Sequence, residues 1–350
     1  MSKFTLSLSG GGKLSVPFQV GALFALKDCD LVPRVSLVTS SGTGNIVAAS
    51  MMQTIFNRKK VNIEDGDEKA VPIESEETWM NNLFTNYIYP NHPLRVWTST
   101  MFKPWTWCCE SSTQSILSRN IERAIEISPT LSQDIVSDDG KVPLFALNAF
   151  TSNYDEAVQL CYVSQDQVGY GVDDRSIEFN SICTVLNNSS LSKFLANSTS
   201  WFNYQPGRNK PWANCVLTDP YAQTAVKHIE PLAKQKIIID GYTNGPVFNR
   251  QSPAVRQVAQ QQLPRSNVVS CFDHALLSHE SSTVSHKVSE LLNGFDENHV
   301  TEHMFHTLVS WGYIQTLRKF SPNTKRTFRS SVNIDDELVR LLLPPVAKKE

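Results

Sequence analysis

Three short stretches of the chain carry residue types that suit acyl-transfer chemistry. The first is the glycine run Gly10–Gly12, directly after an alternating apolar segment at the N-terminus. The second is a turn of small residues, Ser40-Ser41-Gly42, and the third is Asp240-Gly241 after the apolar run 236–239. Acyl transfer needs a nucleophile, a base and backbone N–H donors that hold the developing oxyanion. The three stretches provide candidate positions for these three parts.

The small-residue turn has the pattern of a nucleophile elbow, in which a buried strand turns sharply into a helix. The tip residue is strained, and bulky side chains two positions to either side of it clash. With Ser40 or Ser41 at the tip, at least one flanking position holds a β-branched residue. With Gly42 at the tip, the flanks are Ser40 and Gly44, and glycine adopts positive φ without steric cost. The sequence therefore predicts an elbow whose tip has no hydroxyl.

The elements that must position these stretches alternate between strands and helices. Apolar runs predict strands at 1–9, 37–39, 142–151, 157–163, 236–239 and 268–272. Helical spacing predicts helices from about Pro17 and over 45–57, 112–127, 190–202, 254–262, 282–292, 300–319 and 333–343. We therefore expect a single α/β domain over residues 1–350, with a mostly parallel sheet flanked by helices. Because functional groups gather beyond the carboxyl ends of such strands, the three stretches are expected in one pocket.

One part of the chain departs from this alternation. Residues 58–77 are polar and acidic, which predicts a surface loop or a disordered insertion. Residues 79–107 are rich in aromatic side chains, and their prolines argue against regular structure. We expect an acidic and aromatic insertion at about 58–110 and a helical C-terminal part at about 280–345. Trp105 and Trp107 are candidates for lipid or partner contact, and the alternative is a packed insertion over the sheet edge.

Composition narrows the class of protein. Of the 350 residues, 41% are apolar, and the formal net charge of −2 gives no reason to expect a nucleic-acid partner. The apolar runs are too short for a membrane span, and the N-terminal segment lacks the apolar region of a signal peptide. We therefore expect an intracellular protein, cytoplasmic or peripheral at a membrane, and not a secreted one. The seven cysteines lack metal-type spacing, which favours free thiols.

A second chemistry is indicated by the spacing of His299, Glu302 and His303, which matches one class of zinc peptidase. His306 adds a further histidine one turn along. However, no downstream carboxylate ligand is evident, and apolar residues such as Phe305 fit a packed helix. We therefore expect no metal site and no cofactor.

The three acyl-transfer stretches, in this order, resemble the motifs of the patatin-like lipid acyl hydrolases, a family that includes many phospholipases. The stretch 8–12 resembles the oxyanion turn, 39–49 resembles the elbow with its helix, and 239–241 resembles the Asp-Gly motif. The resemblance implies that Asp240 is the base of a Ser-Asp dyad. It also implies that Gly10, Gly11 and Gly12 form the oxyanion hole, with Gly11 and Gly12 as the donors.

This sequence departs from the family pattern at positions that bear on catalysis. Gly42 occupies the position of the nucleophilic serine, Leu14 and Ser15 replace the usual Arg and Gly, and Tyr242 replaces the second glycine of the Asp motif. Removing the nucleophile from such a catalytic unit typically costs about 10^6-fold in turnover. The sequence therefore predicts a patatin-like protein that is catalytically silent and binds a lipid or a protein partner.

Other interpretations stay open at this point. The chain is alternatively an active lipid acyl hydrolase that uses Ser40 or Ser41 with Asp240, or a hydrolase in which Gly42 replaces a native serine. It is also compatible with a structural or assembly protein that reuses the fold. Asp240 is alternatively a residue that caps the end of a strand, because Asp-Gly is a common turn pair.

Overall fold

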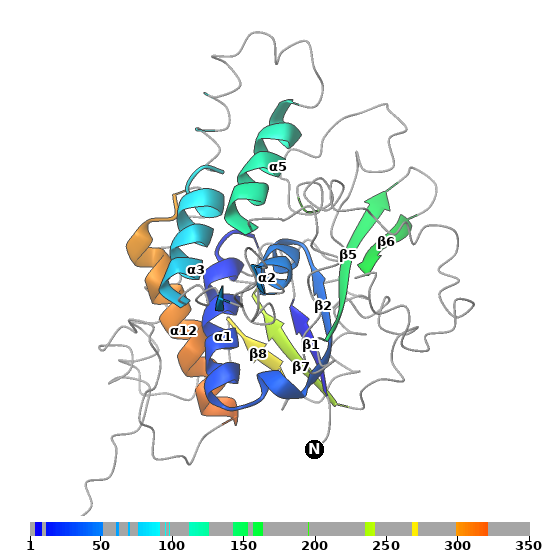
Figure 1. Ribbon diagram of the computed structural model, residues 1–350, viewed down its shortest axis with the longest axis vertical. Helices are drawn as coiled ribbons and strands as arrows, with labels where there is room; N and C mark the ends of the chain where they lie inside the picture. The colour runs from blue at the N-terminus through cyan, green and yellow to red at the C-terminus, as the bar shows by residue number, and fades with distance from the viewer. Residues whose placement is uncertain are drawn as a thin grey trace, which may run out of the picture.

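The computed structural model describes residues 4–8, 12–51, 61–62, 69–70, 76–91, 95, 98, 112–125, 143–152, 157–163, 195, 235–241, 268–271 and 299–320. Within them a central sheet is covered by helices, so the predicted α/β fold class is confirmed (Figure 1). None of the described helices is long and apolar enough to cross a bilayer.

The central sheet has six strands in the order β6-β5-β2-β1-β7-β8. Their bounds are β1 Phe4–Leu8, β2 Val35–Ser41, β5 Leu144–Ser152, β6 Ala157–Val163, β7 Gln235–Asp240 and β8 Val268–Ser270. Neighbouring strands run parallel, except that the edge strand β6 is antiparallel to β5. The predicted mostly parallel sheet is therefore confirmed.

Strand β1 lies at the centre of this sheet, between β2 and β7. Even its polar residues are buried: Thr5 is 2% exposed and Ser7 is 3% exposed. The Thr39 hydroxyl on β2 donates a hydrogen bond of 3.2 Å to Ser7 Oγ. This contact provides one polar partner for a strand that is covered on both faces.

The strand register brings the three acyl-transfer stretches to one edge of the sheet. At the carboxyl end of β1, Leu8 pairs with Ser40 of β2 and with Ile239 of β7. Because the three strands are parallel, their carboxyl ends lie side by side. The elbow and Asp240 therefore lie at the ends of the two strands that flank β1, and the glycine run follows β1 in the sequence.

Helices α1 (Ser15–Asp28) and α12 (Glu302–Phe320) lie against each other and cover the sheet (Figure 1). Their backbones approach closely where each helix has a glycine. A Cβ atom on Gly21 would lie 1.9 Å from the Val309 carbonyl oxygen, and one on Gly312 would lie 2.0 Å from the Phe18 carbonyl oxygen. Gly21 therefore permits the close packing of the two helices, and its counterpart on α12 is Gly312.

The remaining described elements precede or follow the sheet strands. Helix α2 begins directly after the elbow, α5 packs against it, and α3 packs against α5 (Figure 1). The bounds are η1 Val32–Arg34, α2 Thr43–Met51, α3 Glu76–Asn82, a π-helical continuation η3 Leu83–Ile88, and α5 Ser112–Ile125. The predicted helices 190–202 (apart from Leu195), 254–262, 282–292 and 333–343 lie outside the described residues.

The acidic part of the insertion contains regular structure. Strands β3 (Val61–Asn62) and β4 (Lys69–Ala70) form a short antiparallel pair, and α3 begins at Glu76. Of the two predictions for 58–77, a disordered insertion is wrong at these residues, whereas a surface loop is compatible with so short a strand pair. Two-residue strands are shorter than the 4–8 residues by which an alternating pattern reveals a strand.

The prediction of irregular structure is also wrong for the first part of the aromatic segment, where α3 and η3 form a continuous helical run. Trp79 and Tyr87 are each 2% exposed, and Trp79 packs edge-on against Phe24 with 5.4 Å between ring centroids. The prolines that argued against helix begin at Pro90, after the helical run ends. These aromatic side chains therefore belong to the core. Trp105 and Trp107 lie outside the described residues.

Candidate functional site

A single residue, Gly42, makes the turn between strand and helix at the elbow. Strand β2 ends at Ser41 and α2 begins at Thr43. Gly42 is buried and has a φ of 60°, in the region that disfavours residues with a Cβ atom. Its carbonyl oxygen accepts the first turn's hydrogen bond from the Asn45 N–H, at 2.9 Å. The predicted strand–turn–helix geometry with Gly42 at the tip is therefore confirmed.

The two serines before the tip lie within strand β2. Ser40 is fully buried, and its hydroxyl donates to Asn45 Oδ1 at 2.7 Å. This hydrogen bond directs the Ser40 proton to a neutral amide, which is no general base. Ser41 is the last residue of β2, and its side chain lies outside the described residues. Ser40 therefore belongs to the end of β2, one residue beyond the predicted strand 37–39.

A hydrogen-bonded pair of hydroxyls joins the glycine turn to the elbow. Gly12 has a φ of 78°, and its carbonyl oxygen accepts a 2.7 Å hydrogen bond from Ser15 Oγ. Thr43 Oγ1 lies 2.6 Å from Ser15 Oγ. Because a serine hydroxyl has one proton and Ser15 gives it to the Gly12 carbonyl, Thr43 donates to Ser15. The chain of donors therefore runs from Thr43 through Ser15 to Gly12.

The Asp240-Gly241 stretch also contacts Ser15. A Cβ atom on Gly241 would lie 2.4 Å from Ser15 Cβ and 2.8 Å from Gln19 Nε2. Gly241 directly follows Asp240, so Ser15 contacts all three candidate stretches. The sequence identified Ser15 only as a departure from the family pattern. Ser15 is the first residue of α1, but nothing in the sequence marks it as a contact of all three stretches, because these contacts depend on tertiary packing.

Asp240 is the last residue of β7 and is only 5% exposed. Its carbonyl oxygen accepts the Cys271 N–H at 2.8 Å, and the Cys271 carbonyl accepts from Trp311 Nε1 at 2.9 Å. These bonds tie the end of β7 to β8 and α12. The burial of Asp240 is compatible with a base as well as with a strand-end residue, so its catalytic role stays a prediction. Gly10 and Gly11 lie outside the described residues. The oxyanion hole formed by Gly10, Gly11 and Gly12, with Gly11 and Gly12 as the donors, stays a prediction too.

The Asp240 carboxylate affects the pKa of the Cys271 thiol. Burial raises the pKa of Cys271 well above its ordinary value, and the negative charge of Asp240 raises this pKa further. Both effects disfavour the thiolate, which is the reactive form.

We expect Cys271 to react much more slowly with iodoacetamide than Cys29, which is half-buried. Replacing Asp240 with asparagine removes the smaller of the two causes, so the pKa of Cys271 falls and its alkylation moves to lower pH. Mass spectrometry of the two cysteine peptides over a pH series measures this. A pH dependence at Cys271 that is unchanged in Asp240→Asn would show that the carboxylate does not act on the thiol.

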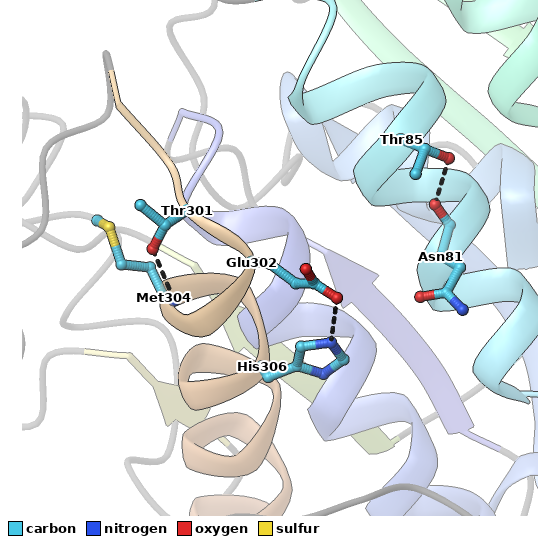
Figure 2. Close-up of polar contacts among 6 residues, drawn as sticks. All are labelled: Asn81, Thr85, Thr301, Glu302, Met304 and His306. Carbon is cyan, nitrogen blue, oxygen red and sulfur yellow. Dashed lines mark hydrogen bonds and ion pairs between the residues drawn. The ribbon is translucent and has the colours of Figure 1, made fainter.

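The histidine cluster does not have the arrangement that a zinc peptidase helix needs. Helix α12 begins at Glu302, so His299 precedes it and does not share a helical face with His303. Figure 2 shows the ion pair between Glu302 and His306, whose Oε1 and Nε2 atoms are 3.9 Å apart. Within the part of the chain that the structure describes, no group of three His, Cys, Asp or Glu residues is placed to hold a metal ion.

The N-terminal cap of α12 explains why His299 lies outside the helix. Thr301 Oγ1 accepts a 3.2 Å hydrogen bond from the Met304 N–H, as an N-terminal capping residue does (Figure 2). Figure 2 also shows Thr85, whose hydroxyl donates to the Asn81 carbonyl at 2.6 Å on the neighbouring helical run. The Thr301 hydroxyl therefore caps the start of α12, and the Thr85 and Glu302 side chains make contacts within their own helical runs.

The chain was compared with known proteins. No family model and no curated protein matches it. Among solved structures, VipD from Legionella pneumophila is 11% identical, with 92% of this chain and 67% of that chain covered and a TM-score of 0.38. The complex of full-length SpcU with full-length ExoU, from the type III secretion system of Pseudomonas aeruginosa, gives 11% identity, coverage of 97% and 67%, and a TM-score of 0.26. Both similarities are too weak to carry an argument. The candidate site is therefore inferred only from the contacts within this chain.

Proposed function

We propose that this chain is a patatin-like domain that does not hydrolyse esters and acts by binding a lipid or a protein partner. The observation that carries the proposal is the elbow, where Gly42 alone forms the tip between β2 and α2. A covalent acyl-enzyme needs a nucleophilic side chain at that position, and glycine has none.

The hydroxyl groups near the elbow also support the absence of ester hydrolysis. The Ser15 hydroxyl donates to the Gly12 carbonyl and accepts from Thr43, and the Ser40 hydroxyl donates to Asn45. In each case the proton is directed to a neutral acceptor, whereas an activated hydroxyl needs a base as its acceptor. These contacts argue against an active hydrolase that uses Ser40.

The patatin-like part of the proposal rests on the order and the placement of the three stretches. They resemble the family motifs in sequence, and the register of β1, β2 and β7 brings the strand ends before them together. Ser15 then contacts Gly12, Thr43 and Gly241. Lipid is the ligand that the resemblance implies, and a protein partner is the alternative ligand.

We expect the unmodified chain to show no turnover of a p-nitrophenyl ester or of phosphatidylcholine above that of heat-denatured protein. The matched variants are Gly42→Ser and Gly42→Ala. Both add a Cβ atom at a φ of 60°, which costs about 1–2 kcal/mol of stability, but only serine adds a hydroxyl. We therefore expect any gain of ester hydrolysis in Gly42→Ser alone.

Binding is measured on the same samples by sedimentation with phosphatidylcholine vesicles. Vesicle binding without turnover supports the lipid-binding form of the proposal. Turnover by the unmodified chain that is lost in Ser40→Ala would overturn the proposal that the chain does not hydrolyse esters. Absence of both turnover and vesicle binding would leave a protein partner or an assembly role as the function.

A further inference from the structure

The helical run formed by α3 and η3 contains a π-helical turn. In η3 the Tyr89 N–H donates to the carbonyl oxygen of Phe84, five residues earlier, at 2.9 Å. The residues that flank η3, Asn82 and Tyr89, have α-helical backbone angles. π-Helical turns are rare and occur mostly as single turns within α-helices, frequently at functional sites. The contacts that hold this turn in place of an α-helical one are therefore of interest.

Packing fixes the run before and within the π-helical turn. Trp79 of α3 is 2% exposed and packs edge-on against Phe24 of α1. Leu83, Tyr87 and Ile88 of η3 are buried as well. The start of the run is therefore held against the core.

Two hydrogen bonds fix the residue at which the run ends. The Lys13 ammonium donates to the backbone carbonyl oxygen of Asn91, and Asn91 Oδ1 accepts a 2.8 Å hydrogen bond from Asn120 Nδ2 of α5. These three residues, which we call the latch, are each 9% exposed or less. Burial strengthens such hydrogen bonds because water competes less for their atoms. Since Lys13 directly follows Gly12, the latch joins the end of η3 to the glycine turn and to α5.

The latch is incompatible with an α-helical turn at η3. With the start of the run fixed, an α-helical turn would shift the following residues by about one position, roughly 1.5 Å along the axis and 100° around it. This shift breaks both hydrogen bonds of Asn91, whose donors and acceptors must lie about 2.7–3.2 Å apart. Tyr89 would move too. It is 47% exposed, and the Arg95 guanidinium lies 3.6 Å from its ring centroid.

We propose that η3 is a conformational switch whose π-helical state is held by the latch of Lys13, Asn91 and Asn120. In the latched state the glycine turn, the end of η3 and α5 are joined. In the released state η3 is α-helical, the exposed surface at Tyr89 is shifted, and the glycine turn has lost the contact between Lys13 and Asn91. A ligand or partner that favours one state at either place therefore shifts the other place as well. The switch needs neither lipid binding nor the absence of ester hydrolysis, so it does not rest on the proposed function.

Hydrogen exchange of the full chain, followed by mass spectrometry, tests the switch. Asn120→Ala removes the bond on the α5 side of the latch, and Lys13→Met removes the other bond but keeps the aliphatic stem. In both variants we expect exchange over 83–91 and over 12–20 to be at least about threefold faster, because losing a buried hydrogen bond shifts a local opening equilibrium by that factor. Exchange in β7 is expected to stay at the rate of the parent.

The matched control is Thr85→Val. It removes the hydrogen bond from the Thr85 hydroxyl to the Asn81 carbonyl within the same helical run, but it leaves the latch intact. We therefore expect no change over 12–20 in this variant. Two results would overturn the proposal: exchange over 12–20 that stays at the parent rate in both latch variants, or exchange that rises equally in β7, which is a global loss of stability.

A deletion tests the register of the turn itself. Removing Thr85, which is exposed, leaves Phe84 and Tyr89 at the four-residue spacing of an α-helix, without moving the two ends of the run. In this background the latch no longer opposes an α-helical turn. Asn120→Ala should therefore accelerate exchange at the end of the run less than it does in the parent, and circular dichroism shows whether each variant is folded. Equal acceleration in a folded deletion variant would show that the latch does not hold the π-helical register.

Discussion

Replacing Gly21 with valine is expected to lower the free energy of unfolding by about 3 kcal/mol or more. The first side-chain atom would lie 1.9 Å from the Val309 carbonyl oxygen, and a backbone atom cannot rotate away as a flexible side chain can. Helices α1 and α12 must therefore move apart along their contact. Gly312→Val is expected to have a similar effect from the other helix, because its Cβ atom would lie 2.0 Å from the Phe18 carbonyl oxygen. Urea unfolding followed by circular dichroism measures both variants.

The control for this prediction is Lys27→Val on the same helix. Lys27 is exposed, so valine there replaces a side chain at the surface, and the lower helix propensity of valine costs about 0.5 kcal/mol. If Gly21→Val loses no more stability than Lys27→Val, the two helices do not approach as closely as described.

Replacing Gly241 with alanine is expected to lower the free energy of unfolding by about 1–3 kcal/mol. Its Cβ atom would lie 2.4 Å from Ser15 Cβ, at the point where the Asp240 stretch meets the glycine turn and the elbow. The expected loss comes from this contact, because Gln19 Nε2, at 2.8 Å, is the end of a flexible side chain that can move.

The matched variant is Ser15→Gly, which removes the Cβ atom that Gly241→Ala would meet. Ser15→Gly alone also loses the hydrogen bonds with Gly12 and Thr43, so it is expected to be destabilising. The double variant should lose less stability than the sum of the losses in the two single variants. The difference, which is the coupling free energy, is expected to be about 0.5–3 kcal/mol. Strictly additive losses would contradict the contact between Gly241 and Ser15, and with it the convergence of the three stretches.

The elements that short-range patterns encode could be predicted from the sequence. The strands β1, β2 and β7 follow from apolar and β-branched runs, and the parallel sheet follows from their alternation with helices. The elbow tip follows from local sterics, because only Gly42 has small residues two positions to either side. The φ of 60° at Gly42 agrees with that argument.

The contacts between distant parts of the chain could not be predicted in this way. Ser15 has no feature in the sequence that marks it as the residue where three stretches meet, and Lys13 has none that pairs it with Asn91, 78 positions away. Both depend on tertiary packing. The helix predicted over 300–319 begins two residues later in the structure, where Thr301 caps α12, and both the predicted and the observed bounds leave His299 outside the helix.

The central claim is that Gly42 leaves the elbow without a nucleophile. Incubation of the unmodified chain with a fluorophosphonate probe, followed by measurement of its intact mass, tests this claim most directly. We expect no covalent adduct, because no serine hydroxyl is at the tip. An adduct that peptide mapping places on Ser40 or Ser41, and that disappears when this serine is replaced by alanine, would contradict the claim.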